Sequence, residues 1–430
     1  MSTTDFRQHL RPGEPTFWIA LIGVAVALSP ANTKVAGAAW LFICVAGAVV
    51  AFQSRKVRVD LSDGVAAASR AWLVCCAVSA MLATALALYR PHGPDSLHAE
   101  YRLLAAAAAV HVLVRKRPWS PVWRSLMLPA VAMACVTALL QVAVTPDRLF
   151  LPSNALPWAV SVAFLLCLLL PRLFSAPDST NRRWWGVAAV AGLLAVLMSQ
   201  SRGAYGVLLL PLWLAGSAWR QTHLQARLGR LATAGVAAML LLAASAWHPA
   251  DPLRLRLAVT EVSNAQAQGD YNTSMGARVY LWSLAWHGFT ESPLVGIGGQ
   301  ERLKRIHEAG LDLPDAQRSQ LAVVRKVGHV HNQYLHAAMD GGLVGLAATL
   351  AVLAGLAAGA FRLRRIDRVA SQQMAGLLFM HATASLTNVN MAHNYYAVML
   401  ALAVSLVLLG ARRTPGDPAA AGLPDPAAVR

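Results

Sequence analysis

The sequence predicts an all-α polytopic membrane protein with about 12 transmembrane helices and one large helical loop between helices 9 and 10. Two observations carry this fold class. Hydrophobic residues make up 57% of the 430 residues and charged residues only 13%, which leaves too few polar groups to cover a water-soluble globule. Apolar runs close to the length that crosses a bilayer, about 20 residues, also recur along the chain.

The predicted spans alternate with short polar loops. Nine precede the large loop and three follow it, and the first and fourth are the weakest. The first follows a polar segment without a clear cleavage site and is expected to be retained as a helix. All five cysteines lie inside spans, which indicates small core residues and no disulfide framework. The approximate ranges are residues 16–29, 35–52, 71–89, 99–114, 126–144, 155–174, 184–200, 203–219, 231–248, 334–360, 370–390 and 394–411.

Lysine and arginine fall mainly in alternate loops, which predicts the orientation of the spans. Clusters such as Arg115–Arg117 and Arg362–Arg368 lie on one side. The opposite short loops hold only Lys34, Arg90, Arg148 and Arg202. Cytoplasmic loops carry the excess of cations in membrane proteins, so both termini are predicted to be cytoplasmic. This topology also explains the formal net charge of +17 better than a nucleic-acid partner does, and no nucleic acid is expected.

The spans and loops divide the chain into four parts. Residues 1–248 hold helices 1–9, and residues 249–330 form a helical loop on the side away from the cytoplasm. Residues 331–413 hold helices 10–12. Residues 414–430, rich in Ala, Pro and Gly, are expected to form a disordered cytoplasmic tail.

Within the large loop, Thr273 or Ser274 is predicted to begin a helix with one apolar, aromatic face. That face suits a membrane interface, and it suits equally well packing on the loop's own core. Pro293 and the glycines at 296–299 are expected to end the helix, and a second one follows at residues 300–310. The residues of the aromatic face recur at spacings of three and four and are Val279, Trp282, Trp286 and Phe289.

Two arginines on the outer side are candidates for binding an anion. Arg202 lies in a tight turn between two spans, where Gly203 lets a ligand approach the backbone. Its alternative role is to satisfy carbonyls at a helix end. Arg278 lies near the start of the aromatic helix, where a guanidinium can bind phosphate through two parallel hydrogen bonds. Its alternative role is a surface ion pair with Glu261 or Asp270.

His331 is the candidate for proton transfer, because its ordinary pKa lies near physiological pH. In a helical register of about 100° per residue, Gly342 and Gly345 fall roughly 20° and 40° to either side of it. The register therefore predicts a histidine above a strip of small residues that lets a neighbouring helix come close. Asn332 is expected to orient a partner, and His329 and His336 lie nearby in the sequence.

A metal site is not predicted. His329 and His331 alternate as two zinc ligands would, but that pair alone is a weak signal and no cysteine lies near it. The chain also lacks an Asp-x-Asp sequence, which metal-dependent enzymes that use sugar nucleotides usually display. No cofactor is expected.

The pattern of these residues resembles the bacterial O-antigen ligases. These enzymes share a superfamily with O-antigen polymerases and protein O-oligosaccharyltransferases. The resemblance spans roughly residues 185–411, and the first six spans match only in number and hydropathy. The residues that carry it are His331, Asn332, Gly342, Gly345, Arg278 and the tetrapeptide Ser201–Ala204.

The resemblance implies an inverting, metal-independent glycosyltransferase in the bacterial inner membrane, with its active site facing the periplasm. Such an enzyme transfers O-antigen from undecaprenyl diphosphate to an outer-core sugar of lipid A-core, so these two molecules and membrane lipids are the expected partners. His331 would accept the proton of the acceptor hydroxyl, with support from Asn332. Arg202 and Arg278 would bind the diphosphate.

Three alternatives remain open at this point. An O-antigen polymerase or a protein O-oligosaccharyltransferase would use the same chemistry on a different acceptor. Protein-transferring relatives tend to carry extra C-terminal domains, which this chain does not show. A lipid or solute transporter is the alternative from another class, although transporters usually place ionisable residues near the bilayer midplane, and these spans are almost free of central charge.

Overall fold

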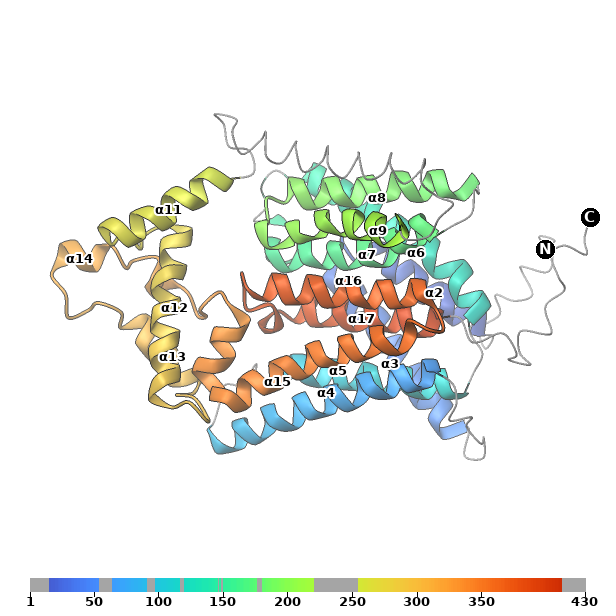
Figure 1. Cartoon of the computed structure of the whole chain (residues 1–430), viewed down its shortest axis with the longest axis horizontal. Helices are drawn as coiled ribbons and strands as arrows, with labels where there is room; N and C mark the ends of the chain where they lie inside the picture. The colour runs from blue at the N-terminus through green and yellow to red at the C-terminus, as the bar shows by residue number, and fades with distance from the viewer. Residues whose placement is uncertain are drawn as a thin grey trace, which may run out of the picture.

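The computed structural model describes residues 15–53, 64–90, 97–116, 120–145, 147, 150–175, 180–219 and 254–411. Every regular element within these residues is a helix, which confirms the all-α prediction. Figure 1 shows helices that run along the long axis of the molecule as a bundle, with α11 (Leu255–Gln268) to α14 (Asp315–Ser319) gathered at one end. The predicted ninth span and the predicted tail at 414–430 lie outside the described residues.

The helices of the first half overlap the first eight predicted spans. Runs of Ala, Leu and Val favour helices here because a helix satisfies its own backbone groups where lipid offers no partner. The eighth predicted span is a 3-10 helix, η3 (Arg202–Leu209), that continues into α9 (Leu210–Trp219). The preceding helices are α2 (Pro15–Leu28), α3 (Thr33–Gln53), α4 (Gly64–Tyr89), α5 (His98–Lys116), α6 (Ser120–Val144), α7 (Ala155–Ser175) and α8 (Thr180–Met198).

Three helices complete the bundle after the loop. They are α15 (Gln333–Leu363), α16 (Arg368–Ser385) and α17 (Asn394–Gly410), with a short 3-10 turn, η5 (Asn390–Ala392), before the last. Both α7 and α17 are buried along almost their whole length, and Phe164 of α7 stacks edge-on against Tyr396 of α17 with ring centroids 5.2 Å apart. This core holds the ends of the other helices in fixed positions.

Among the described helices, five are long and apolar enough to cross a membrane, namely α3, α4, α6, α7 and α15. Four shorter apolar helices accompany them, at Trp18–Leu28, Arg183–Met198, Arg202–Leu214 and Asn394–Gly410. The α5 helix, which matches the weak fourth prediction, carries charged residues at both ends. The described part of the chain is therefore that of a helical membrane protein.

The large loop folds into a cap of short helices with a hydrophobic core of its own. Between α11 and α14 lie α12 (Ser274–Glu291) and α13 (Gly299–His307), and η4 (Val324–Lys326) follows. Leu281, Ile306 and Val324 are buried at the centre of the cap. Thr273 caps α12 by accepting a hydrogen bond from the Gly276 N–H, as one of the two sequence alternatives predicted.

The aromatic face of α12 is not the face that packs on the cap core. The buried face consists of small or aliphatic residues, including Ala277, Leu281 and Ala285. Trp286 is 57% exposed, and its ring lies 5.7 Å from that of Phe289. The prediction that the aromatic face packs on the cap core is therefore wrong for Trp286, whose exposure suits a membrane interface.

The α15 helix is broken at Gly342, where φ is 59° and ψ is −147°. A strap formed by residues 293–298 lies against this break and supplies the missing hydrogen bonds. The Leu343 N–H donates to the Pro293 carbonyl at 2.7 Å. On the other side of the break, the Ile297 N–H donates to the Met339 carbonyl at 2.8 Å. The strap thus ties the cap to α15 through the backbone.

The break overturns the helical register predicted for Gly342 and Gly345. His331 precedes the helix, and Gly342 interrupts it, so the three residues do not share one regular face. Gly342 instead provides a left-handed backbone, because a side chain there would collide with the Leu294 carbonyl. The close approach of another helix is still present, since Leu86 of α4 lies within 4 Å of the position that a Cβ would take at Gly345.

Candidate active site

His331 lies in the turn that leads into α15, at the end of the bundle that carries the cap (Figure 1). Its Nδ1 lies 3.2 Å from Oδ1 of Asn388, in the loop between α16 and α17. The Asn388 amide is oriented by its own hydrogen bond to Oδ1 of Asn390 at 3.3 Å. Because an amide oxygen only accepts hydrogen bonds, His331 donates from Nδ1 and keeps its lone pair on Nε2.

Three histidine rings form a cluster at this position. The His329 and His331 rings meet edge to face with centroids 4.3 Å apart, and the His393 ring lies 6.2 Å from that of His329. Burial is the main cause that lowers the pKa of His331 to about 3, and His329 and Arg278 contribute to the same shift. Burial also lowers the pKa of His329, to about 4, and that of His393. The rings are therefore neutral near pH 7, and Nε2 of His331 can accept a proton.

Arg278 lies near the start of α12. Its Nη1 donates to the Met275 sulfur at 3.2 Å, and its Nε is buried without a hydrogen-bond partner. The pKa of Arg278 is lowered to about 10, mainly by burial and also by the neighbouring Arg202, while Glu261 opposes the shift. Glu261, one of the predicted alternative partners of Arg278, accepts from the Met275 N–H at 2.9 Å. Arg278 is thus a partly buried cation with spare donor capacity.

Arg202 approaches from the first residue of η3. Its Nη1 donates to the Arg254 carbonyl at 2.9 Å, at the residue that precedes α11. Arg202 therefore satisfies a backbone carbonyl, which is the alternative role predicted for it. The carbonyl lies at the start of a cap helix. Its influence on the pKa of Arg278 shows that the fold brings the two predicted arginines near one another. Two like charges held together in a partly buried place favour an anion between them.

Asn332 has a structural role that the sequence did not indicate. Its side-chain oxygen accepts hydrogen bonds from the Tyr334 and Leu335 N–H groups at 3.0 and 3.1 Å, so it caps α15. The ring of His331 is oriented by Asn388 instead. The next residue, Gln333, accepts from the Met391 N–H at 3.1 Å and so holds the α16–α17 loop against the start of α15.

Backbone strain is concentrated around these residues. Three non-glycine residues of the described chain have a positive φ, and they are Gln200, Arg254 and His331. Gln200 precedes Arg202 by two residues, and Arg254 provides the carbonyl that Arg202 binds. Each such conformation costs about 1–2 kcal/mol, so the rest of the fold must impose it. Strain of this kind gathers at functional sites more often than elsewhere.

A buried ion pair fixes the loop that carries the histidines. Nε of Arg302, in α13, lies 2.8 Å from Oδ1 of Asp340 in α15, and the Arg302 side chain is only 9% exposed. Its Nη1 also donates to the Gly328 carbonyl, next to His329. Nε2 of His336 lies 3.5 Å from the same carboxylate. His336 therefore belongs to this supporting network and not to the ring cluster.

The end of the bundle beneath the cap holds several buried polar atoms without hydrogen-bond partners in the described residues. A polar atom in such a place costs about 1–3 kcal/mol unless a ligand or water satisfies it. Within the described residues, no group of three or more His, Cys, Asp or Glu side chains could hold a metal ion. These unsatisfied atoms include Arg278 Nε, Trp282 Nε1, His329 Nδ1, Asn390 Nδ2 and His393 Nε2.

Together, the fold and this site define a helical membrane protein that gathers two arginines and a neutral histidine at one end of its bundle. Residues 187–350 match the family model described as O-antigen ligase. This match confirms the resemblance found in the sequence. The matched range includes Arg202, Arg278 and His331. No curated protein matches the chain.

Sequence reasoning missed Asn388, His393 and Arg302. The first two lie in the segment Thr387–Asn394 between two apolar spans. Its dense polar residues, in a loop predicted to lie on the same side as His331, were an available signal. Arg302 carried no such signal, because its partners Asp340 and Gly328 become neighbours only when the cap packs on α15.

Proposed function

We propose that the protein is a lipopolysaccharide O-antigen ligase. In this proposal it transfers an O-antigen glycan from undecaprenyl diphosphate to an outer-core sugar of lipid A-core. The observation that carries the proposal is the buried, partly unsatisfied guanidinium of Arg278 beside Arg202 and the His331 ring. Inverting glycosyl transfer from a lipid diphosphate requires cations that bind the diphosphate and a nitrogen that accepts a proton. The match to the O-antigen ligase family supports the same chemistry.

In the proposed reaction, the acceptor hydroxyl oxygen attacks the anomeric carbon as Nε2 of His331 takes its proton. The bond between the anomeric carbon and the diphosphate oxygen breaks, and its electron pair leaves with undecaprenyl diphosphate. Arg278 and Arg202 stabilise the negative charge that develops on that leaving group. Asn388 holds the imidazole in the tautomer that leaves Nε2 unprotonated. Attack from the face opposite the leaving group inverts the anomeric centre.

The proposal includes the topology and the four-part division drawn from the sequence. Twelve spans would place both termini in the cytoplasm and the cap, at residues 249–330, in the periplasm of a bacterial inner membrane. The position of the site supports this arrangement, because both substrates are lipid-anchored and the site lies where the bundle meets the cap. The exposed Trp286 would then lie at the membrane interface, where its amphipathic ring is favoured.

The test is a transfer assay with purified protein, undecaprenyl diphosphate-linked glycan and lipid A-core, carried out in a chelator. The most informative variant is His331→Asn, because asparagine tolerates the left-handed backbone at this position better than alanine does. His307→Asn, on the exposed surface of the cap, is the matched control. The proposal expects glycan on lipid A-core with the wild type and the control, and none with His331→Asn.

Other products would identify other members of the superfamily. Longer glycans on the undecaprenyl carrier, without modified lipid A-core, would identify a polymerase. Transfer to a protein hydroxyl would identify an oligosaccharyltransferase. If no glycan moves in any of these assays while the protein moves a lipid or solute across vesicles, the enzyme proposal is wrong and the transporter alternative replaces it.

A further inference from the structure

A groove between α4 and α15 lies at the opposite end of the bundle from the cap. We propose that this groove binds an anionic phospholipid, whose phosphate lies between two arginines. The inference concerns a separate site and does not depend on the proposed transfer reaction. The groove has a volume of about 320 Å³ and is lined by Ala67, Arg70, Ala71, Val74, Cys75 and Arg362.

The groove exists because the two helices pack closely and small residues lie beside their contact. Figure 1 shows α4 and α15 next to one another, and Leu86 and Trp72 of α4 contact α15 near Gly345 and Gly355. A Cβ at Gly355 would lie 2.8 Å from the Trp72 ring, so the two helices approach closely there. The alanines at positions 67 and 71 have short side chains and leave room for a ligand at the end of this contact.

The charges that border the groove are both positive. Arg70 of α4 and Arg362 of α15 are exposed, and the described residues that line the groove include no Asp or Glu. Two guanidinium groups beside one groove favour an anion, and a phosphate can accept parallel hydrogen bonds from each. A zwitterionic headgroup would find no carboxylate for its ammonium among these lining residues. The groove therefore favours a headgroup with a net negative charge.

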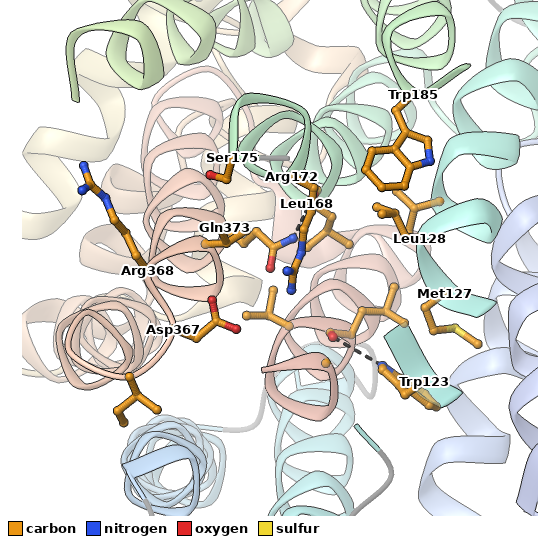
Figure 2. Close-up of a pocket in the computed structure, with 16 residues that line it drawn as sticks. Trp123, Met127, Leu128, Leu168, Arg172, Ser175, Trp185, Asp367, Arg368 and Gln373 are labelled. Atoms are coloured by element: carbon orange, nitrogen blue, oxygen red, sulfur yellow. Dashed lines mark hydrogen bonds between the residues drawn. The ribbon is translucent and has the colours of Figure 1, made fainter. Parts of the chain in front are cut away.

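A second cavity at the same end shows what distinguishes this groove. The second cavity has a volume of about 460 Å³ and is drawn in Figure 2. Its charged residues, Arg172, Asp367 and Arg368, all have interaction partners within the protein. By contrast, neither Arg70 nor Arg362 forms a hydrogen bond or an ion pair with any residue that the structure describes. Their donors are available to a ligand.

The surface next to the groove suits the acyl chains of a lipid. Arg70, Val74, Val78 and Met81 recur at spacings of three and four and so share one face of α4. The last three are 53%, 37% and 62% exposed. An apolar track therefore leads away from Arg70 along α4. A free phosphate ion would make no use of this track, whereas the acyl chains of a phospholipid would cover it.

The position of Arg70 along α4 also fits a lipid phosphate. Both α4 and α15 are long and apolar enough to cross a membrane. The stretch of α4 from Arg70 to Tyr89 rises about 29 Å, close to the roughly 30 Å thickness of the hydrocarbon layer. With Tyr89 at one membrane interface, where tyrosine is favoured, Arg70 lies at the depth of the headgroups on the other side.

The experiment is native mass spectrometry of the delipidated full chain with equal amounts of phosphatidylglycerol or phosphatidylethanolamine. The two lipids carry the same chains and one phosphate each, and only phosphatidylethanolamine carries an ammonium. We expect phosphatidylglycerol to be retained about fivefold or more over phosphatidylethanolamine, the factor that one well-placed arginine contributes to the binding of an anionic lipid. Arg70→Gln and Arg362→Gln should each remove most of this preference.

Two further variants separate the groove from the general positive charge of this end. Arg183→Gln removes an exposed cation from α8, which Figure 1 shows on the other side of the bundle, and should leave the preference unchanged. Ala71→Leu keeps both arginines but fills the groove, so it should weaken the retention of phosphatidylglycerol. Thermal unfolding of each lipid-free variant distinguishes a lost site from a lost fold.

Several results would overturn the proposal. Equal retention of the two lipids by the wild type would exclude recognition of the net charge. An equal loss of preference in Arg183→Gln and Arg70→Gln would show that any cation at this end serves. Unchanged retention in Ala71→Leu would place the lipid outside the groove. A dimer of the delipidated chain that Arg70→Gln dissociates would identify a second copy of the chain as the occupant.

Discussion

The pH dependence of transfer provides the most direct test of His331 as a base. A histidine with the ordinary pKa of 6.5 is about 90% neutral at pH 7.5 and only about 3% neutral at pH 5.0. Its activity as a base would therefore fall about thirtyfold between these two values. Burial lowers the pKa of His331 to about 3, at which the ring stays almost entirely neutral at pH 5.0. We therefore expect kcat/KM to change less than about twofold over this range.

Measuring kcat separately from kcat/KM adds a second expectation. The ratio kcat/KM reports the free enzyme, whereas kcat reports the enzyme with its substrates bound. A bound diphosphate brings negative charge close to His331 and raises the pKa of its ring. The acid limb of kcat should therefore lie at higher pH than the acid limb of kcat/KM. An acid limb of kcat/KM with an apparent pKa near 6.5 would refute the assignment of a buried, neutral His331 as the base.

Stability should fall between pH 7.5 and 5.0 although kcat/KM stays nearly constant. The unfolded chain takes up protons on its histidines below about pH 6.5, whereas the folded chain holds His331 and His329 neutral to about pH 3 and 4. The folded state therefore loses stability as the pH falls below about 6.5. Thermal unfolding in detergent at pH 7.5 and 5.0 should show this loss, and His331→Asn should show less of it.

Three further predictions concern the arginine, the tautomer and the break in α15. Arg278→Lys should reduce transfer about tenfold or more through the loss of parallel hydrogen bonds, while Arg318→Lys on the exposed cap should not. Asn388→Asp should raise the His331 pKa, seen as an acid limb of kcat/KM at higher pH than in the wild type. Gly342→Ala should destabilise the protein by about 3 kcal/mol in thermal unfolding, from left-handed strain and lost hydrogen bonds. Gly186→Ala, with open space around it inside α8, should not destabilise the protein.

The helical fold could be predicted because its causes are local. An apolar run must form a helix in lipid, and the Thr273 cap and the i,i+4 pair of Glu301 and Arg305, 2.9 Å apart, depend only on nearby residues. His331, Arg202 and Arg278 could be selected because a titratable or cationic side chain is unusual where it occurs. Their proximity could not be derived from spacing, since it depends on how the cap packs on the bundle.

The parts that failed depended on assumptions about backbone geometry. The helical-wheel position of Gly342 assumed that α15 is continuous, and a single residue with φ of 59° invalidates that assumption. The left-handed backbone of His331 likewise has no signature in its residue type. The role of Asn388 required knowledge that the turn after α16 folds back onto the start of α15. Tertiary packing decides each of these features.

The strap at residues 293–298 has a consequence for the order in which the protein assembles. In the broken α15, the peptide groups on either side of Gly342 are satisfied by a segment that is synthesised earlier. Until that segment is in place, the N-terminal part of α15 has exposed peptide groups that hydrocarbon does not tolerate. The cap must therefore begin to fold before α15 can settle in its final position. The turn that bears His331 is then completed last, by a loop from the C-terminal end of the chain.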